Sequence, residues 1–357
     1  MMRTMDRKPW ETAVALADHV TSTWNPKMKW MWGEALLGYA LFRLDEYRKT
    51  DRYTAFLTAY CDYYVAHPPI VDQSDTAAPG LITYAMQKKT GDPRYAALTS
   101  KVVDYIKKTP RILEDSVNHL GTGLLGKLYP QSIWVDSLMM FSVFPAWYAS
   151  LENDPELLQI AARQPRVMAK YLMDSKDHLW YHSYWVRQKT HYPRRPIYWG
   201  RGNGWVIASL PMIWELIREN PERASIAELL RATSEALLPY QRPDGTFETV
   251  INRPGKTYRE LSFTALVASG WMQGYRLGLL GERFRDAGVR AFMAVTSAVQ
   301  ISKDAVLMPE ISGPTIPLPV FPYWGYKGVP RKANWSYGIA ALLFAAVEYH
   351  RLCEKDQ

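Results

Sequence analysis

The chain has 357 residues, 48% of them hydrophobic, and a formal net charge of +8. This apolar content is sufficient for a large core, and barrels of this length fold as one unit, so we expect a single domain over residues 1–357. Two cysteines, Cys61 and Cys353, exclude a disulfide framework and favour a reducing compartment.

Targeting signals and nucleic-acid patches are not evident in the sequence. The first twenty residues lack a continuous apolar segment, and no run of about 18 apolar residues predicts a membrane span. A cytoplasmic protein, either a monomer or a weak homo-oligomer, is the expectation. The basic balance attracts acidic partners, which could be nucleic acid or a uronate sugar. Because Lys and Arg are scattered rather than clustered, we expect no nucleic-acid partner.

Helical periodicity dominates the chain, and no segment alternates in the way that is typical of a strand. Residues Trp32, Ala35, Leu36, Tyr39 and Phe42, for example, fall on one helical face. Twelve helices are predicted, at 9–23, 30–49, 51–66, 79–90, 93–109, 134–151, 154–174, 203–220, 222–241, 259–280, 284–302 and 335–353.

The links between these helices alternate in length. Short links rich in Gly, Asp, Asn and Pro, which favour turns and caps, lie near residues 49–51, 90–93, 152–155 and 220–221. The other links are mostly long: 67–78, 110–133, 175–202, 242–258 and 303–334. Six hairpins in a closed ring, an all-α (α/α)6 barrel, would gather these long loops at one end, where we expect the active site. An open α-solenoid is the alternative, although such repeats usually share a clearer period.

Asp136 is the sharpest chemical signal. On a helix over 134–151 it shares a face with Met139, Met140, Val143 and Trp147. An acid on the first turn of an apolar stripe should be partly desolvated, which raises its pKa and suits a proton donor. The alternative is an N-cap Asp that binds backbone N–H groups.

Other polar residues in the long loops are weaker signals. Asp75 ends the 67–78 loop, and its spacing alone favours a turn or cap residue before Pro79-Gly80. His119 and His182 could be exposed loop histidines. They lack metal-ligand spacing, so we expect no metal site. Asp244 and Glu260 flank the 242–258 loop, and Trp324 lies in the last long loop.

The stretch Trp199-Gly-Arg-Gly-Asn-Gly-Trp205 leads into a predicted helix. It is not a dinucleotide fingerprint, because no strand precedes it and the glycine spacing differs. Glycines here allow close backbone approach, which would place Arg201 and Asn203 toward a ligand. The planar fork of Arg suits a carboxylate. Arg201 could instead be structural and pair with an acid such as Glu260.

Several motifs, in the same order, resemble those of the unsaturated glycuronyl hydrolases, especially the unsaturated rhamnogalacturonyl hydrolases of glycoside hydrolase family 105, related to family 88. The specific ones are Ile133-Trp-Val-Asp-Ser-Leu-Met-Met140 and Tyr198-Trp-Gly-Arg-Gly-Asn-Gly-Trp205. The weaker ones are Met28-Lys-Trp-Met-Trp-Gly-Glu-Ala-Leu36, Ala78-Pro-Gly80 and Asn334-Trp-Ser-Tyr-Gly338.

The resemblance implies an (α/α)6 barrel without metal or organic cofactor, acting on a terminal uronate that a lyase has left with a C4–C5 double bond. An Asp at the position of Asp136 protonates C4 and water adds at C5; the hemiketal then collapses and expels the remaining oligosaccharide. Asp75, with Asp72 as competitor, matches the second acid. The implied substrate-binding residues are His119, Trp134, His182, Trp199, Arg201, Asn203, Trp205 and Trp324.

This sequence departs from the family pattern at Ser183, where Gly is usual, at Phe247, where Trp is common, and over residues 309–331, which match no family pattern. These departures bear on substrate preference. Two alternatives remain: another (α/α)6-barrel sugar enzyme, such as an ordinary glycosidase or an epimerase, and a non-catalytic helical carbohydrate-binding protein.

Overall fold

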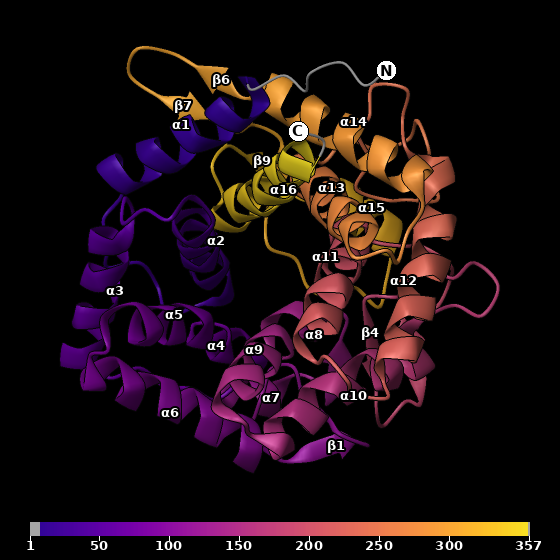
Figure 1. The fold of residues 1–357 in the computed structure, drawn as a ribbon. Helices are drawn as coiled ribbons and strands as arrows, with labels where there is room; N and C mark the ends of the chain where they lie inside the picture. Colours follow the sequence, from indigo (N-terminus) through magenta and orange to yellow (C-terminus); the bar gives the residue numbers. More distant parts are fainter. Residues whose placement is uncertain (1–7, 356–357) are drawn as a thin grey trace.

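A computed structural model describes residues 8–355 of the chain. Its long helices form two concentric rings (Figure 1). The inner ring consists of α2 (Trp32–Arg48), α5 (Gly80–Thr90), α9 (Val143–Glu152), α11 (Gly200–Leu216), α13 (Leu261–Arg276) and α16 (Ser336–Lys355). The outer ring consists of α1 (Lys8–Thr23), α3 (Thr54–Ala66), α6 (Pro93–Lys108), α10 (Pro155–Leu172), α12 (Arg223–Leu237) and α14 (Glu282–Ala298).

The inner ring is closed. Each inner helix packs against the next in chain order, and α16 packs on both α13 and α2. This contact between the last and first inner helices excludes the open solenoid and confirms the (α/α)6 barrel. The inner helices are buried on most sides, because they face both the barrel axis and the outer ring. Within residues 8–355, no helix is long and apolar enough to cross a membrane.

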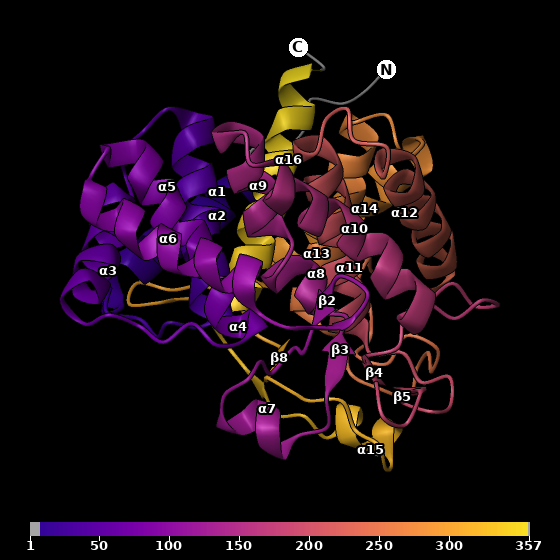
Figure 2. The same cartoon turned by 90° about the horizontal axis from the view of Figure 1, so that it is seen from below.

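The five long loops meet at one end of the barrel, as predicted. Backbone hydrogen bonds join Ser74 to His119 and Gly200 to Thr249, and the Tyr129 hydroxyl donates to the carbonyl of Pro317. Figure 2 shows this loop end below the rings, with α7 and α15 farthest from the termini. The tight links lie at the opposite end. The concentration of polar loop residues at one end is therefore a property of the topology.

Short helices and strands interrupt or extend the predicted helical pattern at the loop end. The helices are α4 (Ser74–Ala77), α7 (Leu124–Leu128), α8 (Ser137–Met140), α15 (Pro322–Lys327) and the 3-10 turn η1 (Leu238–Tyr240). The strands are β1 (Arg111–Leu113), β2 (Ser116–Val117), β3 (Ser132–Trp134), β4 (Ser183–Trp185), β5 (Thr190–Tyr192), β6 (Gln300–Ile301), β7 (Val306–Leu307), β8 (Ile311–Ser312) and β9 (Arg331–Lys332). They form one three-stranded and three two-stranded antiparallel sheets.

The predicted helix over 134–151 is wrong at its start. Residues up to Trp134 belong to β3, whose partner β4 lies about fifty residues later, with Trp134 opposite Ser183. After β3 the chain forms α8, breaks, and continues as α9. Asp136 therefore lies between a strand and a short helix, and the single apolar stripe from Met139 to Trp147 is divided between two helices.

A buried network of charges joins four inner helices near the tight-link end. Arg276 of α13 pairs with Glu215 of α11 at 3.0 Å and with Glu348 of α16 at 2.6 Å. Arg351 adds a second bond to Glu348 at 2.9 Å, and Arg43 of α2 approaches Glu348 to 4.0 Å. The side chains of Arg276 and Glu348 are 12% and 4% exposed, so their ion pair is shielded from solvent, whereas Glu215 is 37% exposed.

Candidate active site

Asp136 is placed by β3 and the turn into α8. Its backbone occupies the N-cap position of α8, yet its side chain makes no capping hydrogen bond. The N-cap interpretation of this acid is therefore wrong. The carboxyl is 14% exposed, and its Oδ2 lies 3.4 Å from Nε2 of His182. Both atoms are buried, and neither has a hydrogen-bond partner among the described residues.

His182 is buried rather than exposed, because β4 carries it into the barrel mouth. Its ring stacks on Trp199 at a centroid distance of 4.2 Å. Its Nδ1 lies 3.0 Å from the hydroxyl of Tyr326, which belongs to α15. Two neighbours therefore fix the plane and the rotation of the imidazole that faces Asp136.

The electrostatics of this pair differ from the sequence-based expectation. Burial raises the pKa of Asp136, but the adjacent His182 and the charges of His119 and Arg201 lower it, and the net direction is downward. Burial lowers the pKa of His182 more than the neighbouring carboxylate raises it. The expected upward shift of the Asp136 pKa is therefore wrong, because periodicity along one helix does not reveal a histidine from another loop.

A second acid–histidine pair lies beside the first. Oδ1 of Asp75, in the first turn of α4, is 3.4 Å from Nε2 of His119. Nδ1 of His119 is 2.8 Å from the hydroxyl of Ser137, the residue after Asp136. His119 is also buried, at 2% exposed, so the exposed-loop interpretation fails for both histidines.

The competitor Asp72 is occupied elsewhere. Its backbone N–H donates to the Thr76 hydroxyl at 3.0 Å, and that hydroxyl lies 3.4 Å from its carboxylate. Asp75 is not the cap of α4, because Gln73 holds that position and makes the capping box with Thr76. The structure thus pairs Asp75, and not Asp72, with a site histidine.

Trp134 connects the two pairs. Its ring stacks on His119 at 4.4 Å and meets the edge of His182 at 5.6 Å. Its indole N–H donates to the Ser132 hydroxyl at 2.9 Å. Trp134 and Trp199 are both nearly buried, at 4% and 2% exposed, so they serve as walls that hold the histidines.

Arg201 lies deep in the same region. Its guanidinium is sandwiched between the rings of Trp199 and Tyr337, each 4.8 Å away, and donates to the carbonyls of Ser312 and Gly313 at 2.7 and 2.8 Å. It is 1% exposed, and its Nε has no partner in the described chain. No ion pair joins Arg201 to Glu260 within residues 8–355. Glu260 instead caps α13 and accepts from the N–H of Ser312.

Asn203 and Trp205 face the protein interior. Asn203 accepts from the N–H of Trp180 at 2.9 Å and donates to the carbonyls of Trp180 and Trp199, both at 3.0 Å. Trp205 is 1% exposed and packs edge-on to Trp32 at 5.9 Å. The geometry therefore assigns Asn203 to positioning the 175–202 loop and Trp205 to the core.

The glycines of this stretch serve helix packing. Helix α11 begins at Gly200, three residues earlier than predicted. A Cβ at Gly200 would lie 2.6 Å from the ring of Phe263 on α13, and one at Gly204 would lie 2.9 Å from the same ring. At Gly200 and Gly204 the close backbone approach is thus real, but its partner is the neighbouring inner helix α13.

Two further predicted residues lie apart from the acid–histidine pairs. Trp324 is 64% exposed on α15, and its ring contacts are with Tyr323 and Lys327. Asp244 accepts from the backbone N–H and hydroxyl of Thr246, at 3.0 and 2.6 Å, which stabilises a turn.

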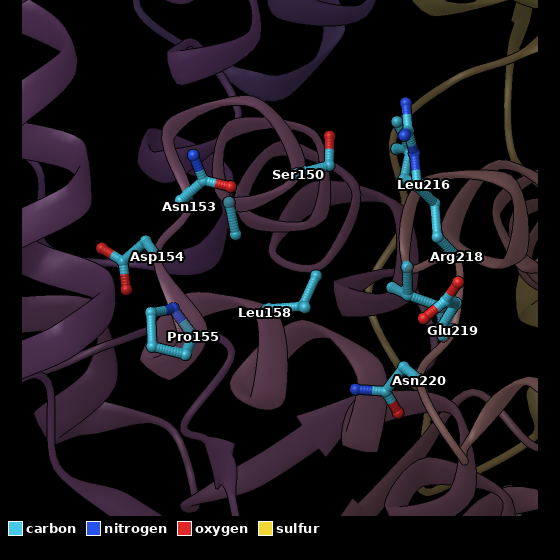
Figure 3. Close-up of a pocket in the computed structure, with 11 residues that line it drawn as sticks. Ser150, Asn153, Asp154, Pro155, Leu158, Leu216, Arg218, Glu219 and Asn220 are labelled. Carbon is cyan, nitrogen blue, oxygen red and sulfur yellow. The ribbon is translucent and has the colours of Figure 1, made fainter.

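A pocket of about 710 Å³ at the tight-link end does not compete with this site (Figure 3). It lies between the α9–α10 turn and the end of α11. Its acid Asp154 already caps α10 through the N–H of Leu157 and pairs with Lys107 at 2.6 Å. Within residues 8–355 no group of three or more His, Cys, Asp or Glu side chains is arranged to hold a metal ion.

Comparison of the sequence with known proteins identifies the family of the chain. The sequence profile of Glycosyl Hydrolase Family 88 matches residues 5–353. The chain belongs to this family. It is therefore a glycoside hydrolase, and the two acid–histidine pairs lie where a barrel of this kind gathers its loops.

Individual relatives are distant in sequence but match over long stretches. The chain is 24% identical to the unsaturated rhamnogalacturonyl hydrolase YesR of Bacillus subtilis over 344 residues, which cover 94% of this chain and 95% of the relative. It is 29% identical to an unsaturated 3S-rhamnoglycuronyl hydrolase of Alteromonas over 209 residues, 56% of this chain and 51% of the relative. A possible family 105 member from Salmonella enterica has the same fold, with a TM-score of 0.87 at 20% identity and coverage of 99% and 96%.

Sequence reasoning missed the residues that hold the two histidines. Ser137 was visible in the motif that contains Asp136, and its hydroxyl next to an acid was a usable signal. Tyr326 lies in the stretch 309–331, which matches no family pattern, and its contact with His182 spans 144 residues of sequence. Only the folded chain reveals it.

Proposed function

We propose that the chain removes a terminal 4,5-unsaturated uronic acid from oligosaccharides produced by a polysaccharide lyase, with pectin-type rhamnogalacturonan fragments as the favoured class. The observation that carries the proposal is the Asp136–His182 pair, whose facing atoms lack hydrogen-bond partners at the end where five loops meet. The names of the two relatives, which both contain a rhamnose and a uronyl group, support the substrate class.

The reaction needs one proton donor and one water. Asp136 delivers its proton to C4 of the enol ether, and water adds to C5. The water proton returns to the carboxylate that the donor has become. The C5 hemiketal then opens the ring, and the anomeric carbon releases the remaining oligosaccharide as an alcohol. One water is consumed and no oxidant or reductant is required.

The lowered pKa of Asp136 is compatible with this role only if binding protonates the carboxyl. The substrate brings its own carboxylate, and a like charge at short distance favours the neutral form of an acid. His182 positions the carboxyl from the other side. Its Nδ1 lies 3.0 Å from the Tyr326 hydroxyl, and its Nε2 faces Oδ2 of Asp136 at 3.4 Å. These two contacts fix the imidazole beside the carboxyl that must take up the proton.

Asp75 and His119 are proposed to assist as a positioning pair. His119 is held on Trp134 and bonded to Ser137, so it fixes the turn that carries Asp136. Asp75 is within reach of the same imidazole. We expect Asp75→Asn to lower kcat, whereas Asp72→Asn should keep a rate close to that of the wild type. If kcat fell further in Asp72→Asn than in Asp75→Asn, Asp72 rather than Asp75 would be the assisting acid.

The deciding experiment is a panel of unsaturated disaccharides prepared by lyases from rhamnogalacturonan, ulvan, heparin-like chains and other polyuronates. Hydration of the conjugated double bond removes its ultraviolet absorbance, which gives a continuous assay. The matched control is the saturated counterpart of each sugar. Turnover of the saturated sugars instead would favour an ordinary glycosidase, and binding without turnover in every case would favour a carbohydrate-binding protein.

A further inference from the structure

A second pocket at the loop end has the composition of an anion-binding site. It measures about 610 Å³, which is within the usual range for small-molecule pockets. Three arginines, Arg194, Arg195 and Arg253, line it together with the aromatic residues Phe321, Tyr323 and Trp324. We call it the arginine–aromatic pocket. Its walls come from three long loops, 175–202, 242–258 and 303–334, and so it belongs to the same end as the acids.

The arginines of this pocket lack acidic partners. None of the three forms an ion pair with a carboxylate within residues 8–355, whereas Arg276 and Arg351 at the other end each do. Arg194 donates to the Tyr192 hydroxyl at 3.2 Å and Arg253 to the carbonyl of Asn252 at 2.6 Å, which leaves further N–H donors on both. All three are exposed. Uncompensated guanidinium groups around one hollow favour a carboxylate or sulfate ligand.

The aromatic wall is unusually open. Phe321 and Trp324 are 74% and 64% exposed. Phe321 also has a left-handed backbone with φ of +50°, which is uncommon for a residue with a bulky side chain and persists only where the surroundings enforce it. Exposed aromatic faces beside cationic groups are suited to a ligand that is flat on one side and charged on another, as an acidic sugar is.

The pocket is joined to the active site through shared residues. Ile197 lines the pocket and also packs in a small apolar cluster with Trp199, Val250 and Tyr326. Tyr326 and Trp324 lie on the same short helix, and the Tyr326 hydroxyl contacts His182. One buried cluster therefore supports both the pocket and His182, which faces Asp136.

We propose that the arginine–aromatic pocket binds an anionic unit of the oligosaccharide beyond the bond that is cleaved, a uronate or a sulfated sugar. That the bound oligosaccharide is also the substrate rests on the proposed function. The binding of an acidic saccharide to the pocket does not. The pocket would select oligosaccharides with an acidic leaving group over unsaturated disaccharides with a neutral one.

A binding experiment tests the pocket without turnover. Calorimetric titration of the full chain uses a saturated acidic rhamnogalacturonan oligosaccharide, the same oligosaccharide with its carboxyls reduced, and a sulfated oligosaccharide. The variant is Arg195→Gln with Arg253→Gln, and Trp324→Ala tests the aromatic wall. The matched control is Arg187→Gln, an exposed arginine of the β4–β5 hairpin outside the pocket.

We expect the double variant to bind the acidic saccharide about threefold to tenfold more weakly, as for loss of two exposed charge contacts. The Arg187 variant should bind the acidic saccharide within about twofold of the wild type, because an exposed charge outside the pocket contributes little. The reduced saccharide should not distinguish the double variant from the wild type. Comparison of the carboxylated and sulfated ligands identifies the preferred anion. Equal binding of the acidic saccharide by the wild type and the double variant would overturn the proposal. The proposal would also fail if a single-stranded DNA of the same charge displaced the labelled acidic saccharide as well as the unlabelled saccharide does.

Kinetics separate this inference from the proposed function. With unsaturated substrates, the double variant should raise KM for an acidic leaving group, leave kcat unchanged, and leave both constants unchanged for a neutral leaving group. If no unsaturated sugar is turned over, the proposed function fails, and the titration still decides the pocket. An equal rise in KM for both leaving groups would contradict the pocket assignment.

Discussion

The two ends of the barrel treat buried charge differently. At the tight-link end, Arg276 makes close ion pairs with Glu215 and Glu348, and each carboxylate has more than one partner. At the loop end, Asp136 and Asp75 each face a histidine at 3.4 Å, and the facing atoms of Asp136 and His182 make no hydrogen bond. One end satisfies its charges and stabilises the ring, whereas the other leaves them available for chemistry.

The strongest test of this contrast is Asp136→Asn. The substitution removes the proposed donor without changing the shape of the side chain, so kcat should fall by a factor of about 10² to 10⁴. The melting temperature should change little, because the carboxyl makes no capping bond. Steady-state kinetics and thermal melting on one preparation measure both. A variant that keeps more than a few per cent of the wild-type rate would remove Asp136 from the mechanism.

At the opposite end, Arg276→Met should act on stability alone. It leaves Glu348, whose side chain is 4% exposed, without its closest partner, and breaking a buried pair costs about 3–5 kcal/mol of unfolding free energy. Chemical denaturation measures this loss. The matched control is Arg94→Met, whose pair with Asp92 is exposed to solvent and should contribute far less to the free energy of unfolding. Equal losses in the two variants would contradict the structural role of the network.

Arg201 lies at the loop end, as Asp136 does, but its guanidinium makes hydrogen bonds within the protein, as that of Arg276 does. Arg201→Met removes donors from the carbonyls of Ser312 and Gly313, and hydrogen bonds to charged groups contribute about 1.5–3 kcal/mol. We expect a lower melting temperature and a nearly unchanged KM in the enzyme that remains folded. A raised KM with an unchanged melting temperature would instead assign Arg201 to the substrate carboxylate.

The smallest expected effect is a pH dependence of stability at the loop end. The pKa of His182 is lowered from 6.5 in the folded chain, so the unfolded chain takes up the proton first as pH falls. The stability that the neutral, buried ring contributes is present above about pH 6.5 and is lost as pH decreases below it.

Melting curves between about pH 7.5 and about pH 5.5 measure this term. The decrease should be smaller in His182→Gln than in the wild type. His67→Gln replaces an exposed histidine and should keep the wild-type decrease. A His182 variant that follows the wild-type curve would show that the ring is not buried in its neutral form.

The fold was predictable because its determinants are local. Helical spacing and turn residues such as Gly91 and Asn153, both in left-handed C-caps, set the hairpins and the short links. The closed ring and the shared loop end then follow from the alternation of link lengths. Strand β3 was not predictable, because three residues pair with a strand on another loop and carry no periodicity of their own.

The candidate site was predictable in its acids and histidines but not in their environment. Asp136 stands out in the sequence, yet the direction of its pKa depends on His182, which arrives from a different loop. Arg201 and Asn203 were recognisable as unusual residues, but only the fold shows that both bind backbone carbonyls. The composition of a loop identifies residues of interest, while their partners come from the topology.

The direction of the helices gives the loop end an electrostatic consequence of its own. All six inner helices begin at this end and the six outer helices finish there. Aligned peptide dipoles give a helix roughly half a positive charge at its start and half a negative charge at its end. The loop face is therefore a disc with a positive centre and a negative rim. These partial charges act within about one turn of each helix end, so the starts of the inner helices favour an anionic group bound at the centre of the loop face over one bound at its rim.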